Sequence, residues 1–128
     1  MSAPGLALLV LLYGAASLLH FAHNAEYLAL YPNLPPTWTR AEVYLAWVLV
    51  TLPGVAGLVL YRRGRARSGL ALLAAWALLG FAGLLHYTRA PFGAHGVAMN
   101  LTICLEVAAA ACLLLQVLRL AVRARATP

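Results

Sequence analysis

The chain has 128 residues, of which 64% are hydrophobic and 9% are charged. This composition excludes a water-soluble globular domain, because such domains carry about 25% charged residues. The net charge of +6 comes from nine arginines and three glutamates, with no lysine and no aspartate. Since the arginines cluster beside apolar runs, as membrane-anchoring arginines do, we expect the lipid bilayer as the partner and no nucleic acid.

The first predicted transmembrane helix covers residues 5–30, and its second half is unusually polar. Residues 5–19 are apolar, and residues 20–27 then bring two imidazoles, an amide, a carboxylate and a phenol into two helical turns. Within an arc of roughly 100° on the helix lie the side chains of His20, His23, Asn24 and Tyr27. Glu26 lies about 60° beyond His23, at the edge of this polar face. Most of the octet can therefore face one cavity.

The second predicted helix covers residues 40–61, after a connection in which three prolines prevent helix formation. Thr39 and Glu42 have the spacing of a capping box, in which each side chain satisfies a backbone amide of the other residue. Glu42 therefore has a sufficient structural role. Pro53 and Gly54 predict a kink in the middle of the helix.

The third predicted helix covers residues 69–87 and ends at His86. Gly80 and Gly83 lack side chains, so they allow another helix or a flat ligand to approach closely.

The fourth predicted helix covers residues 95–120 and carries a polar stripe. The stripe has the spacing i, i+4, i+7 and i+11 and consists of His95, Met99, Thr102 and Glu106. Asn100 lies on a different face. Glu106 should lie about 16 Å below the start of the helix, near the middle of the bilayer. Ionisable groups at that depth are functional candidates, because an unpartnered charge there is unfavourable.

The arginine distribution predicts the orientation of the chain. Seven of nine arginines lie in residues 62–67 and 119–125, so both termini should be cytoplasmic. We expect one all-α domain, residues 1–128, with four transmembrane helices in an antiparallel up-down bundle. The high Ala, Leu and Arg content favours a bacterial cytoplasmic (inner) membrane. All four histidines then lie on the non-cytoplasmic side.

These residues together predict a transition-metal site, with zinc, copper or iron as the ion and with redox or hydrolytic chemistry. The metal ligands would be His20, His23, His86 and His95. The base or anionic ligand would be Glu106 or Glu26, with Tyr27 as a further catalytic group. The hydrogen-bonding residues around the bound group would be Asn24, Thr102 and Asn100.

Three alternatives use the same residues. A single b-type haem could be held by His86 with His20 or His23, with Gly80 and Gly83 making room for the macrocycle. The site could instead bind or transport a small amphipathic ligand such as a lipid or quinone, without a cofactor. The polar groups could also pair with a partner membrane subunit or a second copy of the chain in a homo-oligomer.

Overall fold

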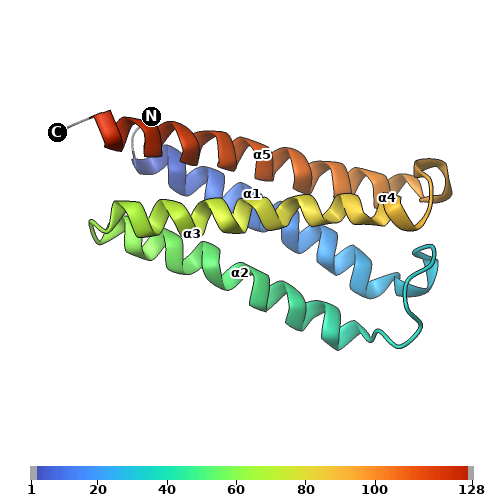
Figure 1. The fold of residues 1–128 in the computed structure, drawn as a ribbon. Helices are drawn as coiled ribbons and strands as arrows, with labels where there is room; N and C mark the ends of the chain where they lie inside the picture. Colours follow the sequence, from blue (N-terminus) through green and yellow to red (C-terminus); the bar gives the residue numbers. More distant parts are fainter. Residues whose placement is uncertain (1–2, 127–128) are drawn as a thin grey trace.

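The computed structural model describes residues 3–126, and these form only helices and their connections. Figure 1 shows the long helices lying side by side as a bundle. In chain order the elements are α1 (Ala3–Glu26), η1 (Leu28–Leu30), α2 (Arg40–Arg62), α3 (Ala66–Leu79), η2 (Gly80–Leu85), α4 (His86–Arg89), η3 (Phe92–Ala94) and α5 (Val97–Ala126). The segments named η are 3₁₀-helices.

Four helical segments are long and apolar enough to cross a membrane: Gly5–Glu26, Arg40–Arg62, Ala66–Arg89 and Val97–Ala124. Large apolar side chains also cover much of the outer surface, including Leu11 on α1, Leu49 on α2 and Leu101 on α5, which are all more than half exposed. A surface of this kind is stable in contact with lipid and not with water. The fold therefore indicates an integral membrane protein, as the sequence predicts.

The first and fourth helices begin or end at other residues than the sequence predicts. Helix α1 ends at Glu26 instead of residue 30, because Tyr31 turns back to bury its ring and precedes Pro32, which disfavours helical geometry. Helix α5 begins at Val97, and His95 before it has extended backbone angles. The predicted capping box at the start of α2 is confirmed, since Thr39 and Glu42 bond each other's backbone amides.

The third membrane segment is not one regular α-helix. Its middle, Gly80–Leu85, is a 3₁₀-helix of six residues between α3 and α4. A 3₁₀-helix has 3.0 residues per turn, so every third residue lies on the same face. Gly80, Gly83 and His86 are three residues apart and therefore point the same way. In a regular α-helix, Gly80 and His86 would differ by about 120°.

The apolar core lies between α1, α3 and α5. Its buried members are Leu6, Val10, Tyr13, Leu70, Leu73, Trp76, Ala77, Ala110, Leu113 and Val117. Tyr13 and Trp76 join the helices α1 and α3, since their ring centroids are 4.3 Å apart and the Tyr13 hydroxyl donates to the Trp76 carbonyl at 3.1 Å. Gly54 brings α2 onto the same indole, because a Cβ there would lie 2.3 Å from it.

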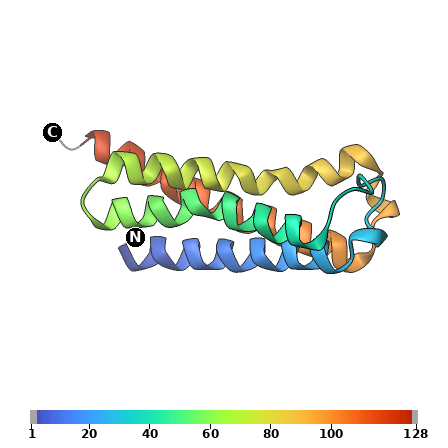
Figure 2. The same ribbon diagram turned by 90° about the horizontal axis from the view of Figure 1, so that it is seen from below.

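Helices α2 and α3 touch near the turn that joins them and separate toward their other ends. A Cβ placed on Gly69 would lie 2.6 Å from the Tyr61 backbone nitrogen, so only glycine allows this contact. Both views show the divergence of α2 from α3 and α4 (Figures 1 and 2). The two termini lie at the same end of the bundle as the α2–α3 turn (Figure 1).

Candidate functional site

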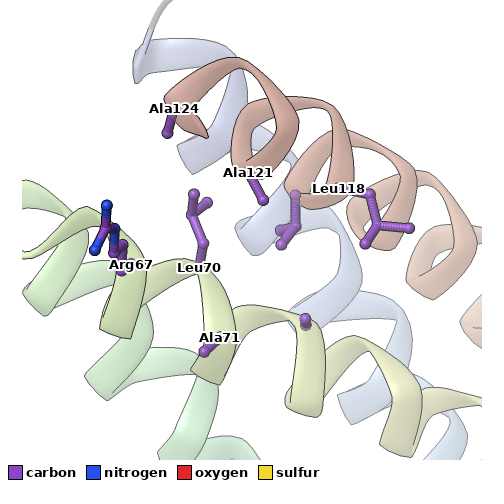
Figure 3. A pocket seen from close by; sticks show the side chains of 8 residues that line it. Arg67, Leu70, Ala71, Leu118, Ala121 and Ala124 are labelled. Atoms are coloured by element: carbon purple, nitrogen blue, oxygen red, sulfur yellow. The ribbon is translucent and has the colours of Figure 1, made fainter. Parts of the chain in front are cut away.

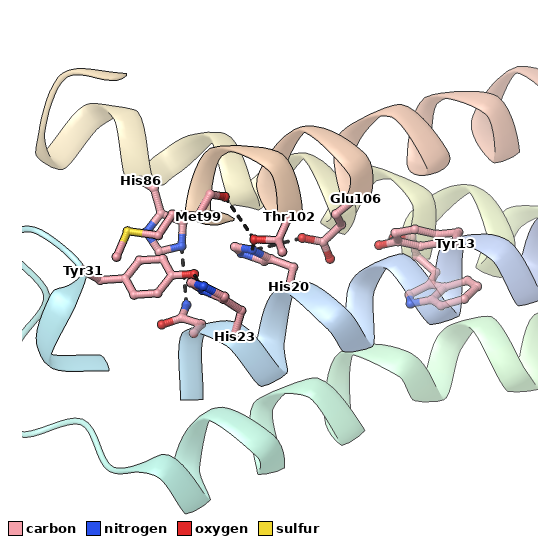
Figure 4. A network of polar contacts seen from close by, with 10 residues as sticks. Tyr13, His20, His23, Tyr31, His86, Met99, Thr102 and Glu106 are labelled. Atoms are coloured by element: carbon pink, nitrogen blue, oxygen red, sulfur yellow. Dashed lines mark hydrogen bonds and ion pairs between the residues drawn. The ribbon is translucent and has the colours of Figure 1, made fainter. Parts of the chain in front are cut away.

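The structure brings the four histidines together, although they come from three different segments. The ring centroid of His86 lies 5.4 Å from that of His20 and 6.2 Å from that of His95. Tyr31 connects the fourth, because its hydroxyl hydrogen-bonds His23 Nδ1 at 2.8 Å and its ring centroid is 5.0 Å from that of His86. Figure 4 shows His20, His23, Tyr31 and His86 from this network, in the space between α1, α4 and α5.

His20 forms the deepest part of the network, where it meets Glu106 and Thr102. The Thr102 hydroxyl donates its proton to the Met99 carbonyl at 3.0 Å, so its oxygen is an acceptor for His20 Nδ1 at 3.4 Å. His20 Nδ1 therefore carries a hydrogen, and Nε2 is left facing Glu106 Oε2 at 3.8 Å. This distance is longer than a hydrogen bond, and the contact is favourable only when one of the two atoms carries a hydrogen. The pair can donate or accept that proton.

Burial makes the contact between His20 and Glu106 important for the stability of the fold. The side chains of His20 and Glu106 are 4% and 3% exposed, so both polar groups are almost completely removed from bulk solvent. A polar group buried without a partner is unfavourable by about 1–3 kcal/mol, and a charge by more. Gly83 lies directly beside the two side chains, since a Cβ there would lie 3.4 Å from Glu106 Oε2 and 3.8 Å from His20 Nε2. The 3₁₀ geometry that points Gly83 inward also directs His86 to the same site.

Asn24 lies one helical turn after His20 on α1. Its Nδ2 is 3.4 Å from His86 Nε2, which therefore acts as an acceptor. Its Oδ1 is buried and has no hydrogen-bond partner among the described residues. This oxygen can accept a further hydrogen bond.

A cavity of about 260 Å³ adjoins these groups, in the region where α2 diverges from the third membrane segment. Its polar lining consists of His20, Asn24, His86, Arg89 and Glu106, and most of the remaining lining residues are apolar side chains from α1, α2 and η2. Leu34 and Trp38 line it from the connection between η1 and α2. An apolar cavity with a few convergent polar groups is the usual form of a small-molecule site.

Six residues predicted for the site do not line the cavity. Three of these, His23, His95 and Thr102, still belong to the polar network beside it. Glu26 is exposed and binds α2, through Arg40 at 3.3 Å and the Tyr44 hydroxyl at 2.9 Å. Tyr27 is half exposed and its ring lies against that of His23. Asn100 accepts a hydrogen bond from the Tyr87 hydroxyl at 2.9 Å and donates to the Phe92 and His95 carbonyls in the turn before α5.

The four histidines do not form a ready metal site. Among the residues that the structure describes, no group of three or more His, Cys, Asp or Glu side chains could hold a metal ion. His20 and His23 have Thr102 and Tyr31 as partners. His95 differs, because its Nδ1 donates to the Pro91 carbonyl at 3.1 Å and its buried Nε2 has no partner among the described residues.

The space expected for a haem beside Gly80 is filled by protein. A Cβ on Gly80 would lie 2.6 Å from both the Tyr13 hydroxyl and the Ala110 side chain. Gly80 therefore allows the close approach of α1 and α5, and a macrocycle does not fit at this position.

Tyr31 is the site residue that sequence reasoning missed. Tyr31 lies in the proline-rich connection after the first predicted helix, yet the structure buries it between His23 and His86. Burial raises the pKa of the Tyr31 hydroxyl to about 12. The sequence carries no signal for this placement, because the 31–39 connection has no periodic pattern.

Comparisons with protein-family models, with curated proteins and with solved structures found no match to this chain. The site must therefore be interpreted from its own chemistry.

Proposed function

We propose that the protein binds a small amphipathic molecule in the cavity beside His20, with an oxygen acceptor of the quinone type at the polar end of the ligand. The observation that carries this proposal is the apolar cavity of about 260 Å³ that reaches the buried His20–Glu106 pair. The apolar walls favour a hydrocarbon ring or tail. A hydrogen on His20 Nε2 or on the Glu106 carboxyl group can turn to the ligand and be donated to its carbonyl oxygen, in place of the contact between the two side chains.

Two further features support a ligand of this kind. Asn24 Oδ1 is an acceptor without a partner among the described residues, which suits the hydroxyl of a reduced ligand. Gly83 leaves the wall beside Glu106 without a side chain, which suits a flat ring. The site therefore has a hydrogen-bond group for the oxidised and for the reduced form of a quinone.

We further propose that the bundle is antiparallel and up-down, lies in a bacterial inner membrane, and has both termini in the cytoplasm. The arginine-rich turn after α2 and both termini lie at one end of the bundle, which fits the positive-inside rule (Figure 1). The cavity then faces the non-cytoplasmic half of the membrane. A reporter enzyme fused to the C-terminus should be active only in the cytoplasm, and activity on the other side would reverse this assignment.

Binding can be tested with a short-tailed quinone and the purified full chain in detergent, using equilibrium dialysis. Val50 lines the cavity, whereas Val48 on the same helix is exposed and does not line it. Val50→Phe should fill the cavity and weaken binding by about tenfold, a loss of about 1.4 kcal/mol. Val48→Phe adds the same ring outside the cavity and should leave the affinity unchanged.

The variant Asn24→Leu tests whether Asn24 forms a hydrogen bond with the polar end of the ligand, because leucine has a similar size but lacks both hydrogen-bonding atoms. The loss of one hydrogen bond should weaken quinone binding by about tenfold. If both phenylalanine variants and Asn24→Leu bind the quinone like the wild type, the molecule only partitions into the micelle and the proposal is wrong.

A second candidate function is metal binding, and the environment of His95 favours it. An imidazole whose Nδ1 donates to a backbone carbonyl, with a free Nε2, has the orientation usual for a metal ligand. A set for a soft ion such as copper would be completed by His86, whose ring centroid is 6.2 Å from that of His95, and by the buried Met99 in the first turn of α5. Metal analysis of the wild type and of His95→Gln tests this, and equal metal content in both would reject it.

A further inference from the structure

A second cavity lies on the opposite half of the bundle, between α3 and α5. It has a volume of about 410 Å³ and is lined by Arg67, Leu70, Ala71, Ala74, Val117, Leu118, Ala121 and Ala124. Leu70 and Val117 are buried and form its floor. Small alanine side chains on both helices leave the groove open, and Figure 3 shows Arg67 at the end of α3 beside it.

No acidic side chain of the residues that the structure describes lines this groove. The chain has only three acidic residues, and all of them are engaged elsewhere. Glu26 pairs with Arg40, Glu42 caps α2, and Glu106 faces His20. No carboxylate side chain among the described residues pairs with Arg67, which is exposed.

We infer that this groove binds one anionic phospholipid, with an acyl chain along the alanines and the phosphate at Arg67. The apolar walls match a hydrocarbon chain, and the groove ends at an arginine beside the basic turn, where the headgroups of the membrane lie. Basic pockets between transmembrane helices bind anionic headgroups for the same electrostatic reason. This site is separate from the cavity at His20 and does not depend on its ligand.

Native mass spectrometry of the full chain in detergent tests the inference, with phosphatidylglycerol and phosphatidylethanolamine of identical chains as probes. The wild type should retain one phosphatidylglycerol in preference to phosphatidylethanolamine. Arg67→Gln should lower the retention of phosphatidylglycerol by about fivefold, the factor expected for one basic residue near an anionic headgroup. Ala121→Leu fills the groove and should lower the retention of both lipids.

Two control variants distinguish binding of the lipid in the groove from a general attraction of anionic lipids to the arginine-rich end of the bundle. Arg63→Gln removes the same charge at the same end, and Ala108→Leu adds the same side chain to an exposed position of α5; neither residue lines the groove. Both should retain phosphatidylglycerol like the wild type. The inference is overturned if Arg67→Gln retains the lipid fully or if Arg63→Gln loses as much. It is also overturned if Ala121→Leu dissociates a protein dimer instead of releasing lipid.

Discussion

The pairing of His20 with Glu106 makes a quantitative prediction for the variant Glu106→Met. Methionine fills a similar volume but cannot share the proton, so His20 Nε2 would remain buried without a partner. Leaving one buried polar group unsatisfied costs about 1–3 kcal/mol, and breaking a buried ion pair costs about 3–5 kcal/mol. We therefore expect Glu106→Met to lower the free energy of unfolding by about 3 kcal/mol, where the two ranges meet.

The double variant His20→Phe/Glu106→Met should recover much of this loss, because it removes both polar groups together. Glu106→Gln should be milder than Glu106→Met, since an amide N–H can donate to His20 Nε2. Reversible unfolding in mixed micelles, followed by tryptophan fluorescence, gives these free energies. The pairing is refuted if Glu106→Met is as stable as the wild type, or if the double variant loses the sum of the two single losses.

Three other predictions concern the fold around the site. Gly69→Ala should destabilise the protein by about 1–3 kcal/mol, because its Cβ would lie 2.6 Å from the α2 backbone. The control Gly14→Ala has its nearest contact at 3.7 Å and should be neutral or stabilising in the same unfolding assay. Thr39→Ala should cost about 1 kcal/mol of unfolding free energy through loss of the cap of α2. Since burial raises the pKa of Tyr31 from 10.0 to about 12, its contribution to stability should be constant below pH 10 and lost between pH 10 and about 12. Ultraviolet titration of tyrosinate against a Tyr31→Phe control measures this, and ionisation of Tyr31 near pH 10 would contradict the burial.

The polar positions on α1 and α5 could be found from sequence because they lie on regular helices. The constant rotation per residue placed His20 with Asn24 on one face, and it placed Thr102 above Glu106 on another. The structure buries all four of these side chains. The same reasoning put Glu26 at the edge of the polar face, and the structure turns it outward to Arg40.

The sequence by itself determined the four apolar segments, the cap of α2 and the concentration of polar groups on α1 and α5, because these depend on local composition and helical periodicity. Only the tertiary structure decided the cavity. The 3₁₀ segment aligns Gly83 with His86, the glycine contacts near Gly69 hold α2 and α3 together at one end only, and Tyr31 folds back onto His23. Each of these depends on contacts between different segments of the folded chain, which no local pattern encodes.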